Sequence, residues 1–215
     1  MNPVRHRVLI VDDHAAIRRG LHDLIESSGN YEIVGQASNG HTALELAEEN
    51  RPDIVTLDYS LPCLNGLEVA HRLKRRMPAV EILVYTFHDR EDFMLQMLRA
   101  GIRGYVPKSD PGEHVLAALE ALSNKQLYLA GTLTETLLDQ LLSAPPTPTA
   151  GNLTSRERSV AQQIAEGRIN KQVAYALGVS IKTIESHRSN IMHKLKLRTT
   201  ADLVRYAVRN NIVMA

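Results

Sequence analysis

The sequence predicts an α/β fold in two parts: a five-stranded, doubly wound parallel sheet, followed by a small all-α domain of four helices. Strand-like and helix-like patterns alternate five times through the first 123 residues. Repeated βα units of this kind form one parallel sheet, because right-handed crossovers bring each strand back beside its neighbours and place helices on both faces. From residue 154 onward only helical patterns occur, which indicates a second, separate domain.

The five predicted strands are short apolar runs that suit strands buried on both faces of a sheet. The third is the clearest, with the sequence IVTL at residues 54–57 and Asp58 as its expected last residue. A helical pattern follows each strand. The strands are predicted over residues 7–11, 32–37, 54–58, 81–86 and 104–106, and the helices over residues 15–27, 42–49, 64–77, 91–100 and 113–123.

The chain after residue 123 changes from helical to irregular. Residues 125–142 carry leucines at helical spacing, which predicts a connecting helix. Residues 143–152, SAPPTPTAGN, hold three prolines and almost no apolar side chain, which is typical of a semi-extended linker. We therefore divide the chain into a first domain over residues 6–123, a connecting segment over residues 124–152, and a C-terminal domain over residues 153–215.

Four helices are predicted in the C-terminal domain, over residues 155–166, 170–177, 181–196 and 201–210. Thr154 and Glu157 have the spacing of a capping box, in which the Thr hydroxyl bonds a free amide and the Glu reaches back. Gly178 lies in the short turn between the second and third helices, and Ser180 is placed to cap the third. Two helices joined by a tight turn that contains Gly indicate helix-turn-helix geometry.

Charge differs between the two parts although the total is only +1. Residues 1–142 hold 14 Lys+Arg and 20 Asp+Glu, a net charge of −6, and residues 143–215 hold 11 and 4, a net charge of +7. A basic domain favours a polyanionic partner such as nucleic acid.

The nine histidines are scattered without zinc-ligand spacing, which argues against a zinc site. We find neither an apolar run long enough to span a membrane nor a secretory signal pattern, so we expect a cytoplasmic protein without membrane contact.

Polar residues stand at the carboxyl ends of four predicted strands. They are Asp12 and Asp13, Asp58, Thr86 and Lys108, and each alone could be an ordinary turn, cap or surface residue. In a parallel sheet, however, these ends meet at one edge, where open α/β folds place their ligands. Three neighbouring carboxylates suit a hard cation such as Mg²⁺. The set predicts phosphoryl transfer, with Asp58 as nucleophile, Lys108 neutralising phosphate charge and Thr86 donating a hydrogen bond.

This part of the chain resembles the receiver domain of bacterial two-component response regulators. The resemblance spans residues 6–123 and implies a flavodoxin-like fold. It rests on VLIVDDH at residues 8–14, the Asp58 strand with Leu61-Pro62 and Gly66, Thr86, and Gly104-Tyr105 leading to Lys108.

The resemblance also implies a role for each matching residue. Asp58 accepts a phosphoryl group from a sensor histidine kinase. Mg²⁺ is held by Asp12, Asp13, Asp58 and the backbone carbonyl of Ser60, while Thr86 and Tyr105 relay the change. Ser60 departs from the pattern, because an apolar residue is usual there, and so does Asn65, where Asp is common. Since Ser60 lies beside the acceptor, we expect it to alter the rate of dephosphorylation.

The predicted helix over residues 181–196 has an apolar and a polar face. Ile181, Ile184, Ile191 and Leu195 are expected to face inward. On geometry alone, the polar face fits either the DNA major groove or an ordinary solvent-exposed helical hairpin. If it binds DNA, the contacts are expected from this face and its flanks, at Lys182, Thr183, Glu185, Ser186, Arg188, Ser189, Asn190 and Lys194.

Residues 153–195 are similar to the LuxR-type helix-turn-helix domain, and the likeness runs to about Val208. Joined to a receiver, such a domain is typical of the NarL/FixJ class of response regulators. The resemblance places Glu185, Ser186 and Ser189 at base-facing positions. Glu185 stands where Lys is common, and a carboxylate there can accept a hydrogen bond from a cytosine amino group.

The expected function is therefore that of a phosphorylation-controlled transcription regulator that binds double-stranded DNA and forms a homodimer when phosphorylated, rather than an enzyme. One alternative is a phosphohydrolase that uses the same Mg²⁺ and Asp58, but it would need a second acid and a substrate cap, and neither is evident. Another is a receiver whose C-terminal domain binds RNA or docks a protein. Preference for duplex DNA over competing RNA distinguishes this last alternative from the first.

Overall fold

The computed structural model describes residues 5–62, 64–87, 91–130, 153–210 and 212–213. The chain forms two compact units, Met1–Ala144 and Pro145–Ala215, and each is described by itself. We call them the N-terminal unit and the C-terminal unit. No helix in the described ranges is both long and apolar enough to cross a membrane.

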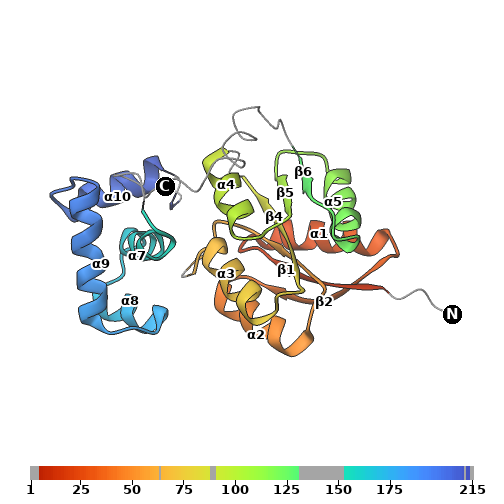
Figure 1. Ribbon diagram of the computed structural model, residues 1–215, viewed down its shortest axis with the longest axis horizontal. Coiled ribbons are helices and arrows are strands. Elements are labelled where there is room, and N and C mark those ends of the chain that lie inside the picture. The colour runs from red at the N-terminus through yellow and green to blue at the C-terminus, as the bar shows by residue number, and fades with distance from the viewer. Residues whose placement is uncertain (1–4, 63, 88–90, 131–152, 211, 214–215) are drawn as a thin grey trace. The chain divides into compact units, whose positions relative to one another are not determined.

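The N-terminal unit is built on one parallel sheet with the strand order β2-β1-β3-β4-β5-β6 (Figure 1). Every residue of β3 and of β5 is buried, as predicted for strands covered on both faces. The doubly wound α/β fold is thus confirmed. The strands are β1 (His6–Val11), β2 (Tyr31–Ala37), β3 (Ile54–Leu57), β4 (Glu81–Thr86), β5 (Gly104–Pro107) and β6 (Tyr128–Leu129).

Helices cover both faces of this sheet (Figure 1). Leu21 and Ile25 of α1 pack with Leu119 and Leu122 of α5 in one core, against Ile10 and other strand residues of the same face. The helices α2, α3 and α4 lie on the opposite face (Figure 1). The bounds are α1 (Ala15–Ser27), α2 (Gly40–Asn50), α3 (Gly66–Arg76), α4 (Glu91–Arg99) and α5 (Glu113–Ser123).

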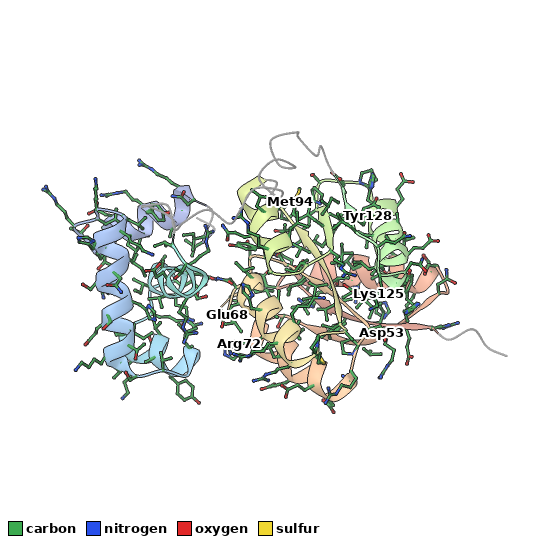
Figure 2. The ribbon with its side chains drawn as sticks, in the orientation of Figure 1. Asp53, Glu68, Arg72, Met94, Lys125 and Tyr128 are labelled. Carbon is green, nitrogen blue, oxygen red and sulfur yellow. The ribbon has the colours of Figure 1, made fainter. Side chains whose placement is uncertain are left out.

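The sixth strand corrects the start of the predicted connecting helix. The chain leaves α5 through Lys125, whose left-handed φ of 60° stops the helix, and β6 then pairs with the outer edge of β5. The Ala130 N–H donates to the Tyr105 carbonyl at 2.8 Å, and the Tyr128 hydroxyl lies 2.7 Å from His114 Nδ1 on α5. Tyr128 is labelled in Figure 2. The remainder of the predicted helix and the predicted linker lie outside the described residues.

The C-terminal unit consists of four helices in its described part, as predicted: α7 (Ser155–Ala165), α8 (Asn170–Leu177), α9 (Ile181–Lys194) and α10 (Thr200–Arg209). Thr154 and Glu157 form the predicted capping box, and the Ser180 side chain accepts from the Thr183 N–H at the start of α9. Gly178 ends α8 with a φ of +65°, a backbone conformation that Gly adopts without strain. The turn between α8 and α9 therefore has the expected helix-turn-helix form.

Candidate functional site

The carboxyl ends of β1, β3, β4 and β5 bring most of the predicted site residues to one edge of the sheet. Strand register aligns these ends, pairing Val11 with Leu57 and Thr86 with Pro107. Asp58 follows β3 directly instead of ending it, and its N–H donates to the Val11 carbonyl at 2.9 Å. The residues after β1, β3 and β5 are therefore positioned by backbone pairing.

A buried ion-pair triad forms the centre of this edge. Lys108 Nζ lies 2.6 Å from Asp12 Oδ2 and 2.7 Å from Asp58 Oδ2. Asp58 is only 3% exposed, so its carboxylate is held by Lys108 with little help from solvent. Two carboxylates facing one ammonium leave an excess negative charge, which is the condition that favours a cation.

The protonation of the triad follows from burial and from these charges. Burial raises the pKa of the Asp12 carboxyl, although the Lys108 hydrogen bond and charge act in the opposite direction. Burial by itself lowers the pKa of Lys108, but the neighbouring Asp58 and Asp12 carboxylates outweigh it and raise that pKa above its ordinary value. Lys108 therefore remains a cation in the site at neutral pH.

The acidic residues fit a divalent cation. Ligand atoms of Asp12, Asp13, His14 and Asp58 all lie within 4.8 Å of one another. Carboxylate oxygens in such an arrangement match the hard-ligand preference of Mg²⁺. Asp13 is exposed, so a cation bound here can keep water molecules in its shell. The neighbouring His14 has its Nδ1 2.7 Å from Asp13 Oδ1.

The loop after Asp58 curls back over the carboxylate. The Ser60 N–H donates to Asp58 Oδ1 at 3.2 Å, whereas cation binding by the Ser60 carbonyl remains a prediction. Asn65 caps α3 by accepting from the Glu68 N–H at 2.9 Å, an acceptor role that an Asp can fill equally well. The Gly66 N–H donates to the Tyr59 carbonyl, and a Cβ on Gly66 would lie 2.3 Å from the Asp58 carbonyl oxygen. The start of α3 therefore fits against the backbone of Asp58 and Tyr59 only because residue 66 is Gly.

The remaining residues at this edge come from β4 and β5. Thr86 and Tyr105 are both buried, and the Lys108 N–H donates to the Thr86 carbonyl at 2.8 Å. Sequence reasoning missed Phe87, which is 58% exposed and has its ring centroid 5.1 Å from Lys108 Nζ, a cation–π contact. The sequence feature that could have indicated Phe87 is its position as an aromatic residue directly after Thr86, a site residue at the end of a strand. The relay role of Thr86 and Tyr105 remains a prediction.

The outward face of α9 carries most of the residues predicted to contact DNA. Lys182, Glu185, Ser186, Ser189 and Asn190 are exposed there. The hydroxyl of Thr183 is hydrogen-bonded to that of Ser180 within the first turn. Ile184 and Ile191 face inward and are fully buried, and Leu195 is half-buried just past the helix end. The inward placement of Ile181 was wrong, because its side chain is 44% exposed.

Two of the predicted DNA-contacting cations are engaged within the C-terminal unit. Arg188 donates to Asn170 Oδ1 at 3.4 Å and to Thr200 Oγ1 at 2.5 Å, so it links the starts of α8 and α10. Lys194 Nζ lies 2.7 Å from Glu157 Oε2. The same Glu157 oxygen accepts the Thr154 N–H that caps α7. Lys194 thus fastens α9 to the first turn of α7.

Replacing Lys194 with Met is expected to destabilise the C-terminal unit by about 1 kcal/mol at neutral pH and to weaken its acid dependence. Burial alone would raise the pKa of Glu157, but the hydrogen bonds from Lys194 and Thr154 outweigh it and lower that pKa below its ordinary value of 4.5. Because the pKa of Glu157 is lower in the folded state, this carboxylate stabilises the fold at pH values above its ordinary pKa of 4.5. The stabilisation is lost as the pH falls through the lower pKa of the folded state.

Thermal unfolding of the full chain and of Lys194→Met at a series of pH values measures this effect. The difference between the two proteins should shrink as pH falls below about 4.5. Lys182→Met removes an exposed ammonium from the same helix and serves as the control. A constant difference across the acid range would contradict the role of the Glu157 pair.

Comparisons with known proteins agree with this arrangement. Residues 8–120 match the response regulator receiver domain, and residues 151–207 match the bacterial regulatory proteins of the luxR family. The chain is 31% identical over 215 residues to the oxygen regulatory protein NreC of Staphylococcus epidermidis, covering 96% of this chain and 99% of that protein. It is 32% identical over 214 residues to NreC of Staphylococcus aureus strain JH9, with the same shares covered.

Solved structures are similar as well. A two-component response regulator of the LuxR family from Aurantimonas sp. SI85-9A1 has a TM-score of 0.57 at 30% identity, covering 65% of this chain and 96% of that chain. RcsB from Salmonella typhimurium has a TM-score of 0.71 at 24% identity over the whole of both chains, a likeness of fold. Such regulators of transcription are not enzymes in the usual sense. The chain belongs to the NarL/FixJ class of two-component response regulators, with an N-terminal receiver domain and a C-terminal LuxR-type helix-turn-helix domain.

Proposed function

We propose that a sensor histidine kinase phosphorylates this response regulator on Asp58 in a Mg²⁺-dependent reaction in the cytoplasm. Phosphorylation then promotes a homodimer that binds specific sites on double-stranded DNA and controls transcription. The observation that carries the proposal is the triad at the sheet edge, where Lys108 Nζ lies within 2.7 Å of both the Asp12 and Asp58 carboxylates. The excess negative charge and the nearby Asp13 oxygen support a cation at the same place.

The residues of the triad have distinct parts in the reaction. An Asp58 carboxylate oxygen attacks the phosphorus of a phosphohistidine, the new O–P bond forms, the N–P bond breaks, and the electron pair stays on the histidine nitrogen. Lys108 already touches Asp58, so its ammonium is in place to contact a phosphoryl oxygen on the product. Bound Mg²⁺, held by Asp12, Asp13, Asp58 and the Ser60 carbonyl, would supply further neutralisation of phosphoryl charge.

The output of the switch involves β4, β5 and then α9. Thr86 and Tyr105 lie on the two strands that end beside Lys108, which supports their part in relaying phosphorylation. RcsB has been solved bound to the promoter rprA in the presence of the phosphomimetic BeF₃⁻, and that structure has a TM-score of 0.67 with this chain at 24% identity. The exposed polar face of α9 supports duplex DNA as the partner here.

Selection of duplex DNA from a random pool by the full chain tests the proposed function. The expected result is enrichment of a defined sequence that becomes stronger when Mg²⁺ and a small phosphodonor are added, because phosphorylation favours the DNA-binding dimer. An RNA competitor at equal concentration should not displace the selected duplex. Equal enrichment with and without phosphorylation would contradict the control step, and enrichment of RNA alone would contradict the DNA partner.

Glu185→Ala should change base preference without weakening non-specific binding. The variant loses an acceptor on the exposed face of α9, so discrimination at one base pair should fall by about 1 to 3 kcal/mol. It also loses a negative charge near the DNA, so binding to unrelated duplexes should hold or strengthen.

Lys182→Ala is the matched control on the same face. Removing this cation should weaken binding to all sequences about equally. It should also reduce the slope of the logarithm of the binding constant against the logarithm of salt concentration by roughly one unit. Affinities for a panel of single-base operator changes at several salt concentrations separate the two behaviours. An unaltered preference profile for Glu185→Ala would show that this side chain does not read a base.

A further inference from the structure

Ile181 is an apolar side chain where the helix-turn-helix presents polar ones. It is the first residue of α9 and is 44% exposed, whereas Ile184 and Ile191 of the same helix are fully buried. The turn that carries it is well defined, because Ser180 Oγ accepts the Thr183 N–H at 3.1 Å. Ile181 therefore projects from an ordered helix start into solvent.

The position of Ile181 links it to the residues proposed to face the bases. Residues four apart on a helix stack on one face, so Ile181, Glu185 and Ser189 form a single row. The side chains of Glu185 and Ser189 are exposed as well. Ile181 thus extends the row of Glu185 and Ser189 by one turn toward the N-terminus of α9. In helix-turn-helix proteins, the N-terminal residues of this helix contact the base edges in the major groove.

The chemistry of the side chain then selects its target. Ile can neither donate nor accept a hydrogen bond, so it cannot read the polar edges of bases. The distinctive apolar group that base pairs display in the major groove is the C5 methyl of thymine. A single exposed Ile is common on protein surfaces and does not by itself indicate a binding role. The position of Ile181 in one row with Glu185 and Ser189 is what indicates such a role here.

We propose that Ile181 contacts the C5 methyl group of a thymine in the DNA site and so helps to specify the sequence bound. This inference rests on the proposed DNA-binding function and adds a specificity-determining residue to it. Burying one methyl-sized apolar contact corresponds to about a fourfold change in Kd. That is the size of preference expected for thymine over a base that lacks the methyl.

Deoxyuridine provides the test, because it differs from thymidine only in lacking this methyl group. The full, phosphorylated chain is bound to its selected duplex, and each thymine of the site is replaced in turn by deoxyuridine. The parent protein should lose about fourfold in affinity at one thymine. Ile181→Ala should bind the thymine duplex about as weakly as the parent binds the deoxyuridine duplex, and should no longer distinguish the two.

Ile169→Ala is the matched control, since Ile169 is 63% exposed in the same unit but precedes α8 instead of lying on α9. It should keep the preference for thymine. The inference is overturned if no thymine shows sensitivity in the parent, or if Ile181→Ala retains the full thymine preference. Failure to enrich any duplex sequence would instead overturn the proposed function, so the two failures are distinguishable.

Discussion

Replacing Asp58 with Asn is expected to abolish covalent phosphorylation at this position. The amide that replaces the carboxylate is a poor nucleophile, and it also removes a ligand from the proposed cation site. The variant should still fold, because Lys108 keeps its 2.6 Å contact with Asp12 Oδ2 and so remains paired in the buried site. The loss therefore reports chemistry and not unfolding.

The measurement is incorporation of phosphoryl from a small phosphodonor with Mg²⁺, with the modified residue located by peptide mass analysis. Asp23→Asn changes an exposed carboxylate on α1 and should be labelled like the parent. Chelating Mg²⁺ should stop labelling of the parent as well. Labelling of the Asp58→Asn protein at residue 58 as fast as the parent would disprove the acceptor assignment.

Replacing Gly66 with Ala should damage both stability and phosphorylation. The added Cβ would lie 2.3 Å from the Asp58 carbonyl oxygen and 2.8 Å from Tyr59 Cα, and both of these are backbone atoms. Either α3 or the acceptor loop must move, which is expected to cost about 1 to 3 kcal/mol of folding free energy. Because Asp58 is held within a short hydrogen bond of Lys108, displacing its loop should slow labelling by about tenfold or more.

Gly20→Ala is the control for this substitution. Gly20 lies within α1, and no neighbouring atom lies within 4 Å of the position that a Cβ would take there. Ala at this position should therefore stabilise the helix by up to about 1 kcal/mol. Both variants are compared with the parent by urea unfolding and by the initial rate of phosphoryl incorporation. Stability and labelling rate should fall in Gly66→Ala, whereas in Gly20→Ala they should rise or stay unchanged. Parent-like unfolding and labelling by Gly66→Ala would show that the loop tolerates the extra carbon.

The sequence predicted which charged residues meet at the sheet edge better than it predicted the contacts around them. Asp12, Asp58 and Lys108 could be grouped because the ends of parallel strands meet at one edge, whatever the side chains do. Phe87 could not be placed beside Lys108 in this way. An exposed aromatic has no periodic pattern, and its contact depends on how the chain turns after β4.

The limits in the C-terminal unit have a similar cause. Helical periodicity grouped Ile181 with Ile184, but a residue in the first turn is buried only if a neighbouring element extends beyond the helix end. Lys194 and Arg188 looked like free cations along α9. Their partners Glu157 and Thr200 lie 37 and 12 residues away in the chain, and pairing across helices leaves no local signal.

The sixth strand has a consequence for where the receiver domain ends. A fragment that stopped at Ser123, the last residue of α5, would leave the outer edge of β5 bare, with the Arg103 and Tyr105 carbonyls unpaired. Open edges of this kind invite pairing with another chain and aggregation. Residues 124–130 cover the outer edge of β5 and so complete the sheet. Natural changes in linker length and fusions to other output domains should therefore begin only after Ala130.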